Sequence, residues 1–275
     1  MITASVVLFH TPNEILQKVI NSYAPNKERK LFLIDNSQKQ LEFAREYAGE
    51  NIQYIFNHKN LGYGSAHNIG IRRAMQDKSE YHIVLNPDIE FETSILQKLC
   101  SYADCHKDVV YMMPKVLYPN GELQYLCKLL PMPLDLAMRR FLSGSKTAKR
   151  RNDKYVLKQS GYDKIINPPC LSGCFMFLRT SALKKHHIMF DDRFFMYFED
   201  FDFIRRLHRI GKTVYYPDAV IVHNHSKESY KNKKMLKIHM KSAVQYFNKY
   251  GWFYDSERKK MNAEILKEIE DLCGG

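Results

Sequence analysis

Apolar residues in the first hundred positions follow two alternating spacings. Short runs such as residues 2–9 are almost continuously apolar, as in a strand buried on both faces. Segments such as residues 13–22 repeat apolar residues three and four positions apart, as on one face of a helix. The pattern predicts strands over residues 2–9, 30–34, 52–56 and 81–85, and helices over residues 13–22, 41–48, 65–75 and 93–103. This repetition predicts an α/β fold with a mostly parallel sheet and helices on both faces.

The pattern changes twice further along the chain. Residues 118–170 are rich in proline and glycine, and we interpret them as an irregular excursion that carries substrate contacts. Later periodicity predicts strands over 171–178, 213–216 and 219–223, and helices over 201–210, 235–250 and 263–272. We therefore expect one α/β domain over residues 1–226 and a basic, amphipathic helical segment over residues 227–275.

Composition narrows the class of protein. The chain has 275 residues, of which 45% are hydrophobic, so it can bury a sizeable core. No apolar run approaches the roughly 18 residues of a membrane span, and the N-terminus lacks a signal-peptide pattern, so a cytoplasmic protein is expected. The formal net charge of +12 favours anionic partners, and lysines and arginines gather in residues 146–154 and 227–241. Six cysteines without a C-x-x-C pair predict neither a zinc site nor disulfides.

Polar residues follow several predicted strands directly. Asp35 ends the second strand, Asp88 closes an Asn-Pro-Asp sequence after the fourth, and His223 ends the last one and is favoured over His225. The carboxyl ends of parallel strands meet at one edge of the sheet, where ligands bind. Asp88 could hold a divalent cation on a diphosphate, although an acid beside a proline is also typical of a turn or a helix cap.

Three acids interrupt an aromatic and aliphatic run over residues 194–207. Apolar neighbours desolvate a carboxylate and raise its pKa, which suits a general base. Asp200 is the candidate base. Glu199 and Asp202 could equally be helix N-terminal acids that complement the helix dipole, and Asp202 in particular suits a structural role.

A glycine-rich segment over residues 57–70 precedes a predicted helix. Glycines there allow the backbone to approach a ligand closely. His67 stands where the dinucleotide-binding fingerprint needs glycine, and the chain has no G-K-[ST] sequence. A nicotinamide enzyme or a P-loop ATPase is therefore disfavoured.

These segments, in their order over residues 2–226, together resemble the motifs of family-2 glycosyltransferases of the rhamnosyltransferase type. By this resemblance Asp200 is the catalytic base, and Asp88 and His223 bind a metal. The resemblance also predicts which residues bind the nucleotide sugar: Phe9, His10, Thr11, Asp35, Asn60, Gly62, Tyr63, Asn68, Asn86 and Pro87. It assigns to the acceptor side Ser172, Gly173, Cys174, Glu199 and Asp202. One departure is Asn86, which stands where the family's metal motif has its first acid.

The resemblance implies a GT-A fold and an inverting transfer from dTDP-rhamnose or a UDP-hexose. Asp200 would deprotonate the acceptor hydroxyl, while Asp88 and His223 would hold Mg²⁺ or Mn²⁺ on the diphosphate. The acceptor would be a glycan or a lipid-linked glycan in bacterial surface polysaccharide synthesis. The basic C-terminal helices would then contact an anionic membrane peripherally, pack on the domain, or form a dimer.

Three other classes compete with this interpretation. A sugar nucleotidyltransferase would need a loop rich in glycine, arginine and lysine after the first strand, but residues 9–13 are Phe-His-Thr-Pro-Asn. The basic charge would suit a non-catalytic nucleic-acid-binding protein, yet no RNA- or DNA-binding motif occurs, so no nucleic-acid partner is expected. Asn86 leaves room for a transferase-like protein without activity.

Overall fold

The computed structural model describes residues 1–136, 145–224 and 233–274. Its centre is an eight-stranded sheet with the order β3-β2-β1-β4-β7-β6-β8-β5. The strands are β1 (Ile2–Leu8), β2 (Arg29–Asp35), β3 (Ile52–Phe56), β4 (Tyr81–Leu85), β5 (Ile89–Glu90), β6 (Val109–Leu117), β7 (Phe175–Arg179) and β8 (Lys212–His223). Only β7 and β5 run antiparallel to their neighbours. The sheet is therefore mostly parallel, as predicted.

Strand register brings the predicted polar residues together. Leu8 pairs with Asp35, so β1 and β2 end side by side. Leu85, the last residue of β4, pairs with Phe175 at the start of β7. Ile89 pairs with His223, which places Asp88 next to the end of β8.

The second half of the sheet differs from the prediction. Strand β6 is absent from the sequence-based assignment. The two short strands expected over residues 213–223 form the single strand β8. A bulge explains the two apparent pieces, because Pro114 pairs with Tyr216 and the next pair is Lys115 with Val220.

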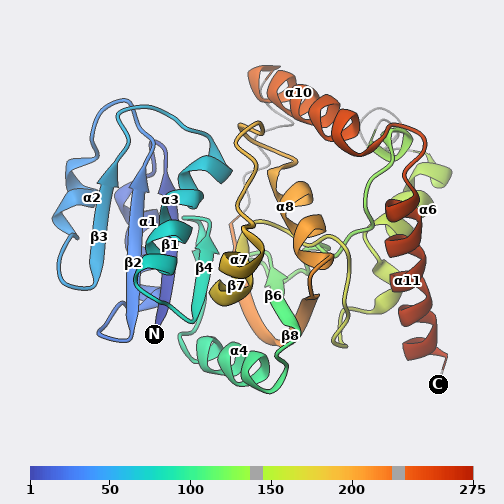
Figure 1. Cartoon of the computed structure of the whole chain (residues 1–275), viewed down its shortest axis with the longest axis horizontal. Helices are drawn as coiled ribbons and strands as arrows, with labels where there is room; N and C mark the ends of the chain where they lie inside the picture. The colour runs from blue at the N-terminus through green and yellow to red at the C-terminus, as the bar shows by residue number, and fades with distance from the viewer. Residues whose placement is uncertain (137–144, 225–232, 275) are drawn as a thin grey trace.

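Helices cover the sheet and the far end of the molecule (Figure 1). They are α1 (Asn13–Tyr23), α2 (Glu42–Glu46), α3 (Tyr63–Gln76), α4 (Ser94–Cys105), α6 (Lys146–Tyr155), the 3₁₀ turn η1 (Lys158–Ser160), α7 (Thr180–His186), α8 (Glu199–His208), α10 (Lys233–Tyr250) and α11 (Ser256–Cys273). The excursion over residues 118–170 is thus partly helical, since its basic patch forms α6. Among the described residues, none of the helices combines the length and apolar character of a membrane span.

The two C-terminal helices pack onto the rest of the chain. Figure 1 shows α10 across one end of the molecule and α11 along the side away from β3. Ile265 and Ile269 of α11 belong to the same buried core as the sheet residues. The buried Arg205 of α8 pairs with Asp255, just before α11, at 2.7 Å. The described part of segment 227–275 is therefore joined to the domain by a shared core.

Candidate active site

Asp88 and His223 lie together where β5 and β8 pair. Asp88 Oδ1 is 3.4 Å from His223 Nε2, and the imidazole is buried. Asn86 Nδ2 is also 3.4 Å from that nitrogen, and Pro87 connects Asn86 to Asp88 in a turn. Burial lowers the pKa of His223, but Cys174 and Asp88 outweigh it and raise the pKa to about 10. His225, the weaker candidate, lies outside the described residues.

The pair has the chemistry of an open metal site. Gln124 Oε1 lies 3.1 Å from His223 Nδ1, which orients Nε2 toward Asp88 as an outer partner orients a metal-binding histidine. Asn86 Oδ1 accepts a hydrogen bond from Tyr63 at 3.0 Å. Among the described residues no three His, Cys, Asp or Glu side chains cluster as metal ligands. Asp88 and His223 thus fit two ligands of a divalent cation, which would need further ligands from outside these side chains.

Asp200 lies in the first turn of α8, on the wall of a cavity of about 270 Å³. The cavity also exposes His223, Lys128 and Glu199. Burial raises the pKa of Asp200, and the Lys128 ammonium partly opposes that rise. The arrangement provides a carboxylate beside a space large enough for a sugar hydroxyl.

Glu199 is more deeply buried than Asp200. Burial and the neighbouring Asp200 raise the pKa of Glu199 well above its usual value. Its Oε2 atom has no hydrogen-bond partner among the described residues. Burial and the charge of Asp200 therefore both favour the protonated form of Glu199.

The loop before β7 lies between Asp200 and the Asp88–His223 pair. Gly173 accepts a hydrogen bond from Tyr63 Oη at 2.7 Å, and the Cys174 carbonyl accepts one from the Asn86 amide at 2.9 Å. A Cβ at Gly173 would lie 3.3 Å from Asp200 Cβ. The Ser172 carbonyl is held by Tyr111 Oη at 2.7 Å. These contacts place the predicted acceptor-side loop directly against Asp200.

The glycine-rich segment is held by contacts within itself and with residues 190–195. Gly62 has φ +84°, and a Cβ there would come within 2.1 Å of the Phe195 carbonyl oxygen. Asn60 Oδ1 accepts a hydrogen bond from the Gly62 amide at 2.8 Å. The buried Asn68 bonds both the amide and the carbonyl of Phe190, each at 2.9 Å. Asn60, Gly62 and Asn68 thus fix the glycine-rich segment and its contact with residues 190–195, and a direct nucleotide contact by any of them stays a prediction.

The first predicted nucleotide contacts divide into exposed and buried groups. Phe9 and His10 are exposed at the end of β1, and the His10 amide bonds Ser37 Oγ at 3.1 Å. Thr11 is buried and accepts a hydrogen bond from the Phe9 amide. The Asp35 carboxylate is fully buried; it accepts hydrogen bonds from the backbone amides of residues 37 and 41 and from the Tyr54 hydroxyl. Asp35 therefore organises the loop, while the exposed rings are accessible to a ligand.

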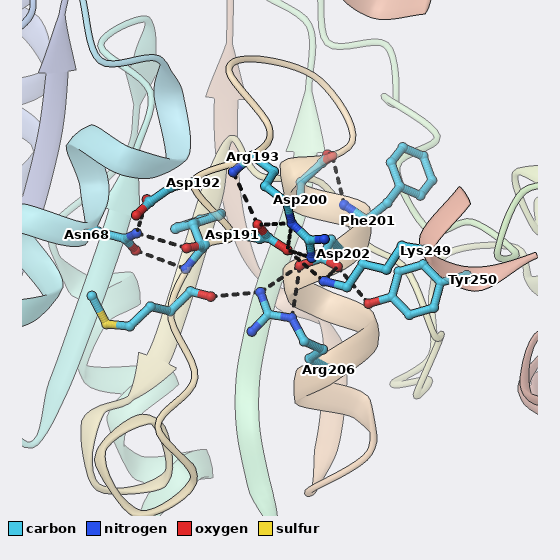
Figure 2. A network of polar contacts seen from close by, with 12 residues as sticks. Asn68, Asp191, Asp192, Arg193, Asp200, Phe201, Asp202, Arg206, Lys249 and Tyr250 are labelled. Atoms are coloured by element: carbon cyan, nitrogen blue, oxygen red, sulfur yellow. Dashed lines mark hydrogen bonds and ion pairs between the residues drawn. The ribbon is translucent and has the colours of Figure 1, made fainter. Parts of the chain in front are cut away.

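Asp202, which the resemblance assigns to the acceptor side and whose position also suits a structural role, lies away from the cavity. Figure 2 shows its side chain in a network between α8 and α10. The fully buried carboxylate pairs with Arg206 at 2.6 Å and with Lys249, and it accepts a hydrogen bond from Tyr250 at 2.6 Å. All of these partners lie away from the cavity lining, so Asp202 is a structural residue.

Pattern reasoning missed the cavity's other polar residues. Gln124 and Lys128 come from the excursion, where neither periodicity nor a strand end marks them, and His239 comes from α10. For Gln124 and Lys128 the only signal is a polar side chain in the excursion, which was expected to carry substrate contacts, and no pattern marks His239.

The sheet order and the site at its carboxyl edge define an α/β transferase of the GT-A type. The family model described as glycosyl transferase family 2 matches residues 6–187, well over half of the chain. The chain belongs to glycosyl transferase family 2, and it is an enzyme of the glycosyltransferase class. Asp200 and His223 lie beyond the matched residues.

Two curated relatives cover most of the chain. Rhamnosyltransferase WbbL of Escherichia coli (strain K12) is 25% identical over 255 residues, which are 88% of this chain and 90% of the relative. N-acetylglucosaminyl-diphospho-decaprenol L-rhamnosyltransferase of Mycobacterium tuberculosis (strain CDC 1551 / Oshkosh) is 26% identical over 232 residues, 80% of this chain and 75% of the relative. The chain is thus similar to rhamnosyltransferases along most of its length.

Solved structures share the fold. S. aureus TarS 1–349 has a TM-score of 0.60 and 17% identity, covering 99% of this chain and 72% of that one. GalNAc-T7 with UDP, GalNAc and Mn²⁺ has a TM-score of 0.61 and 13% identity, covering 99% of this chain and 56% of that one. The predicted GT-A fold is confirmed.

Proposed function

We propose that this enzyme transfers a sugar, with inversion, from a nucleotide-diphosphate donor to a hydroxyl of a glycan or lipid-linked glycan. The observation that carries the proposal is Asp200, whose carboxylate lies on a cavity that also reaches His223. Asp200 takes the proton of the acceptor hydroxyl while the acceptor oxygen bonds to the anomeric carbon. The bond from that carbon to the donor diphosphate breaks in the same displacement.

Asp88 and His223 would hold a divalent cation, Mg²⁺ or Mn²⁺. The cation supplies positive charge against the diphosphate as it leaves. Gln124 keeps the His223 ring oriented, and Tyr63 keeps Asn86 turned toward the same place. Burial and nearby acids raise the pKa of Tyr63 well above its usual value, so its hydroxyl remains a donor.

Two comparisons support the donor and the acceptor classes. GalNAc-T7 was crystallised with UDP and Mn²⁺, and the mycobacterial relative is named for an N-acetylglucosaminyl-diphospho-decaprenol acceptor and rhamnose. We therefore propose dTDP-rhamnose or a UDP-hexose as donor, and a lipid-linked glycan of bacterial surface polysaccharide as acceptor. Such an acceptor would bring the enzyme to the inner face of the membrane as a peripheral protein.

Asp200→Asn tests the base. The amide keeps the shape of the side chain but accepts no proton, so transfer should fall by roughly 10²-fold or more. Donor binding should persist, measured as the rise in melting temperature with UDP or dTDP in the presence and absence of Mn²⁺. Transfer near the wild-type rate would overturn the assignment of the base, and nucleotide binding unaffected by Mn²⁺ would overturn the cation site.

A further inference from the structure

Large apolar side chains are exposed on one face of α10 and on the turn that follows it. Met240 and Val244, one helical turn apart, are 58% and 44% exposed. Phe253 and Tyr254, in the turn before α11, are each 87% exposed. Together with the exposed Lys237 and Lys241, these side chains form what we call the α10 surface.

The turn is rigid, so its aromatic residues are held out from the protein. Gly251, with φ +105°, donates its amide to the Phe247 carbonyl at 2.7 Å, and a Cβ there would lie 2.3 Å from the Tyr254 carbonyl oxygen. Asp255 closes the turn by capping α11 through the Arg258 amide at 2.9 Å. Both ends of residues 251–255 are therefore fixed.

Trp252 joins the turn to the exposed face of the helix. Its Nε1 donates to Asn248 Oδ1 at 2.8 Å, and its ring lies 5.3 Å from that of Phe247. Asn248 follows Val244 by one turn on the same face. Trp252 therefore connects the exposed side of α10 to the turn that carries Phe253 and Tyr254.

The charge of α10 selects the kind of partner. The helix contains five lysines and no acid, and four of the lysines are exposed. A second copy of this face would bring like charges together, which disfavours a symmetric dimer through it. Met240, Val244 and Phe253 carry no hydrogen-bonding group, which favours insertion among lipid chains over contact with a nucleic acid.

The opposite side of α10 reaches the active site, because His239 lines the cavity that contains Asp200. We propose that the α10 surface binds an anionic lipid bilayer, with Phe253 and Tyr254 inserted at the interface and the lysines against the headgroups. The link to a lipid-linked acceptor rests on the proposed function; the lipid binding itself does not.

Co-sedimentation of the full chain with phosphatidylcholine vesicles, with and without phosphatidylglycerol, tests the surface. Lysines near an anionic membrane each contribute about 1 kcal/mol, so K237E/K241E should weaken binding to the anionic vesicles at least about tenfold. F253S/Y254S should weaken it comparably by removing the inserted rings. Both variants should keep transfer to a soluble acceptor, because none of the four residues lines the cavity.

K184E/K185E on the exposed end of α7 is the matched control, since it changes net charge by the same amount elsewhere. It should bind anionic vesicles within about twofold of wild type, and a loss equal to that of K237E/K241E would overturn the proposal. Unchanged vesicle binding by F253S/Y254S, accompanied by loss of a dimer or of oligonucleotide binding, would assign the surface to those partners instead. Asp200→Asn should bind vesicles like wild type, which separates failure of this surface from failure of the proposed chemistry.

Discussion

At the residue scale, burial and a nearby positive charge have opposite effects on the pKa of Asp200. Burial raises its pKa, and the Lys128 ammonium lowers it. Lys128 is held in place, with its ammonium 5.5 Å from the centre of the Phe201 ring. The balance decides the pH at which the carboxylate becomes available as a base.

Lys128→Met should move the acid limb of the kcat/KM profile to higher pH. A base works only when ionised, and loss of the positive charge raises the pKa of Asp200, so a higher pH is needed to ionise it. Near the foot of the profile kcat/KM should fall several-fold, while the plateau at high pH stays close to wild type. Lys128→Arg keeps the charge and should leave the pH profile unchanged. If both variants instead lost kcat/KM equally at every pH, Lys128 would act in acceptor binding and not on the pKa of Asp200.

Sequence patterns located part of the site at this scale. Asp88 and His223 stand out as candidates because each lies at the end of an apolar strand, and Asp200 because an acid in an aromatic run is desolvated. Gln124, Lys128 and His239 do not, because tertiary folding alone brings them to the cavity. For Asp202 the sequence left an acceptor-side role and a structural role open, because spacing cannot tell which of three adjacent acids turns toward α10.

At the element scale, α8 is attached to α10 by a buried ion network. Lys249 bridges Asp202 of α8 and Asp191 of the preceding loop, the latter at 2.8 Å. Arg206 extends the network to the Met189 carbonyl at 2.7 Å. The loop that meets Gly62 and the helix that carries Asp200 are therefore fixed by one set of charges (Figure 2).

Lys249→Met should lower the free energy of unfolding by about 2–3 kcal/mol, because it leaves the buried Asp202 short of one cation. Arg206 still neutralises that charge in part, and the Tyr250 hydroxyl still donates a hydrogen bond to it, which limits the loss. Urea denaturation measures it. The control is Lys260→Met, which removes an exposed pair with Glu264 and should cost less than about 0.5 kcal/mol. Equal losses in the two variants would show that the network adds nothing to stability.

Helices and strands could be predicted where the spacing of apolar residues within the segment itself is regular. The βα repeats up to α4 follow from periodicity. Strand β6 was missed, although most of its residues are buried, because a short apolar run flanked by an irregular segment has no distinctive period. Helix α6 was missed because nearly all of its residues are polar, and only Ala148 and Tyr155 are buried.

At the scale of the whole molecule, the basic helical segment predicted over residues 227–275 contributes to the core. Met261 of α11 packs with Leu130 and Cys170 of the excursion, and Tyr246 and Phe247 pack with the aromatic residues before α8. Composition changes after residue 226, but the described residues beyond 232 contribute buried side chains to the domain's clusters. The predicted boundary at residue 226 therefore marks a change in the composition of the chain, while the described residues on both sides of it pack together.

A chain cut after residue 226 should accordingly fail to fold as a stable unit. It exposes these apolar clusters and leaves Arg205, 1% exposed in the full chain, without Asp255 and Glu257. Loss of these apolar contacts and of the buried ion pairs of Arg205 removes a large part of a domain's total stability of about 5–15 kcal/mol. Size-exclusion chromatography and thermal unfolding should show aggregation and no cooperative transition. A soluble, cooperatively unfolding and nucleotide-binding fragment would instead show that residues 227–275 form a separate unit.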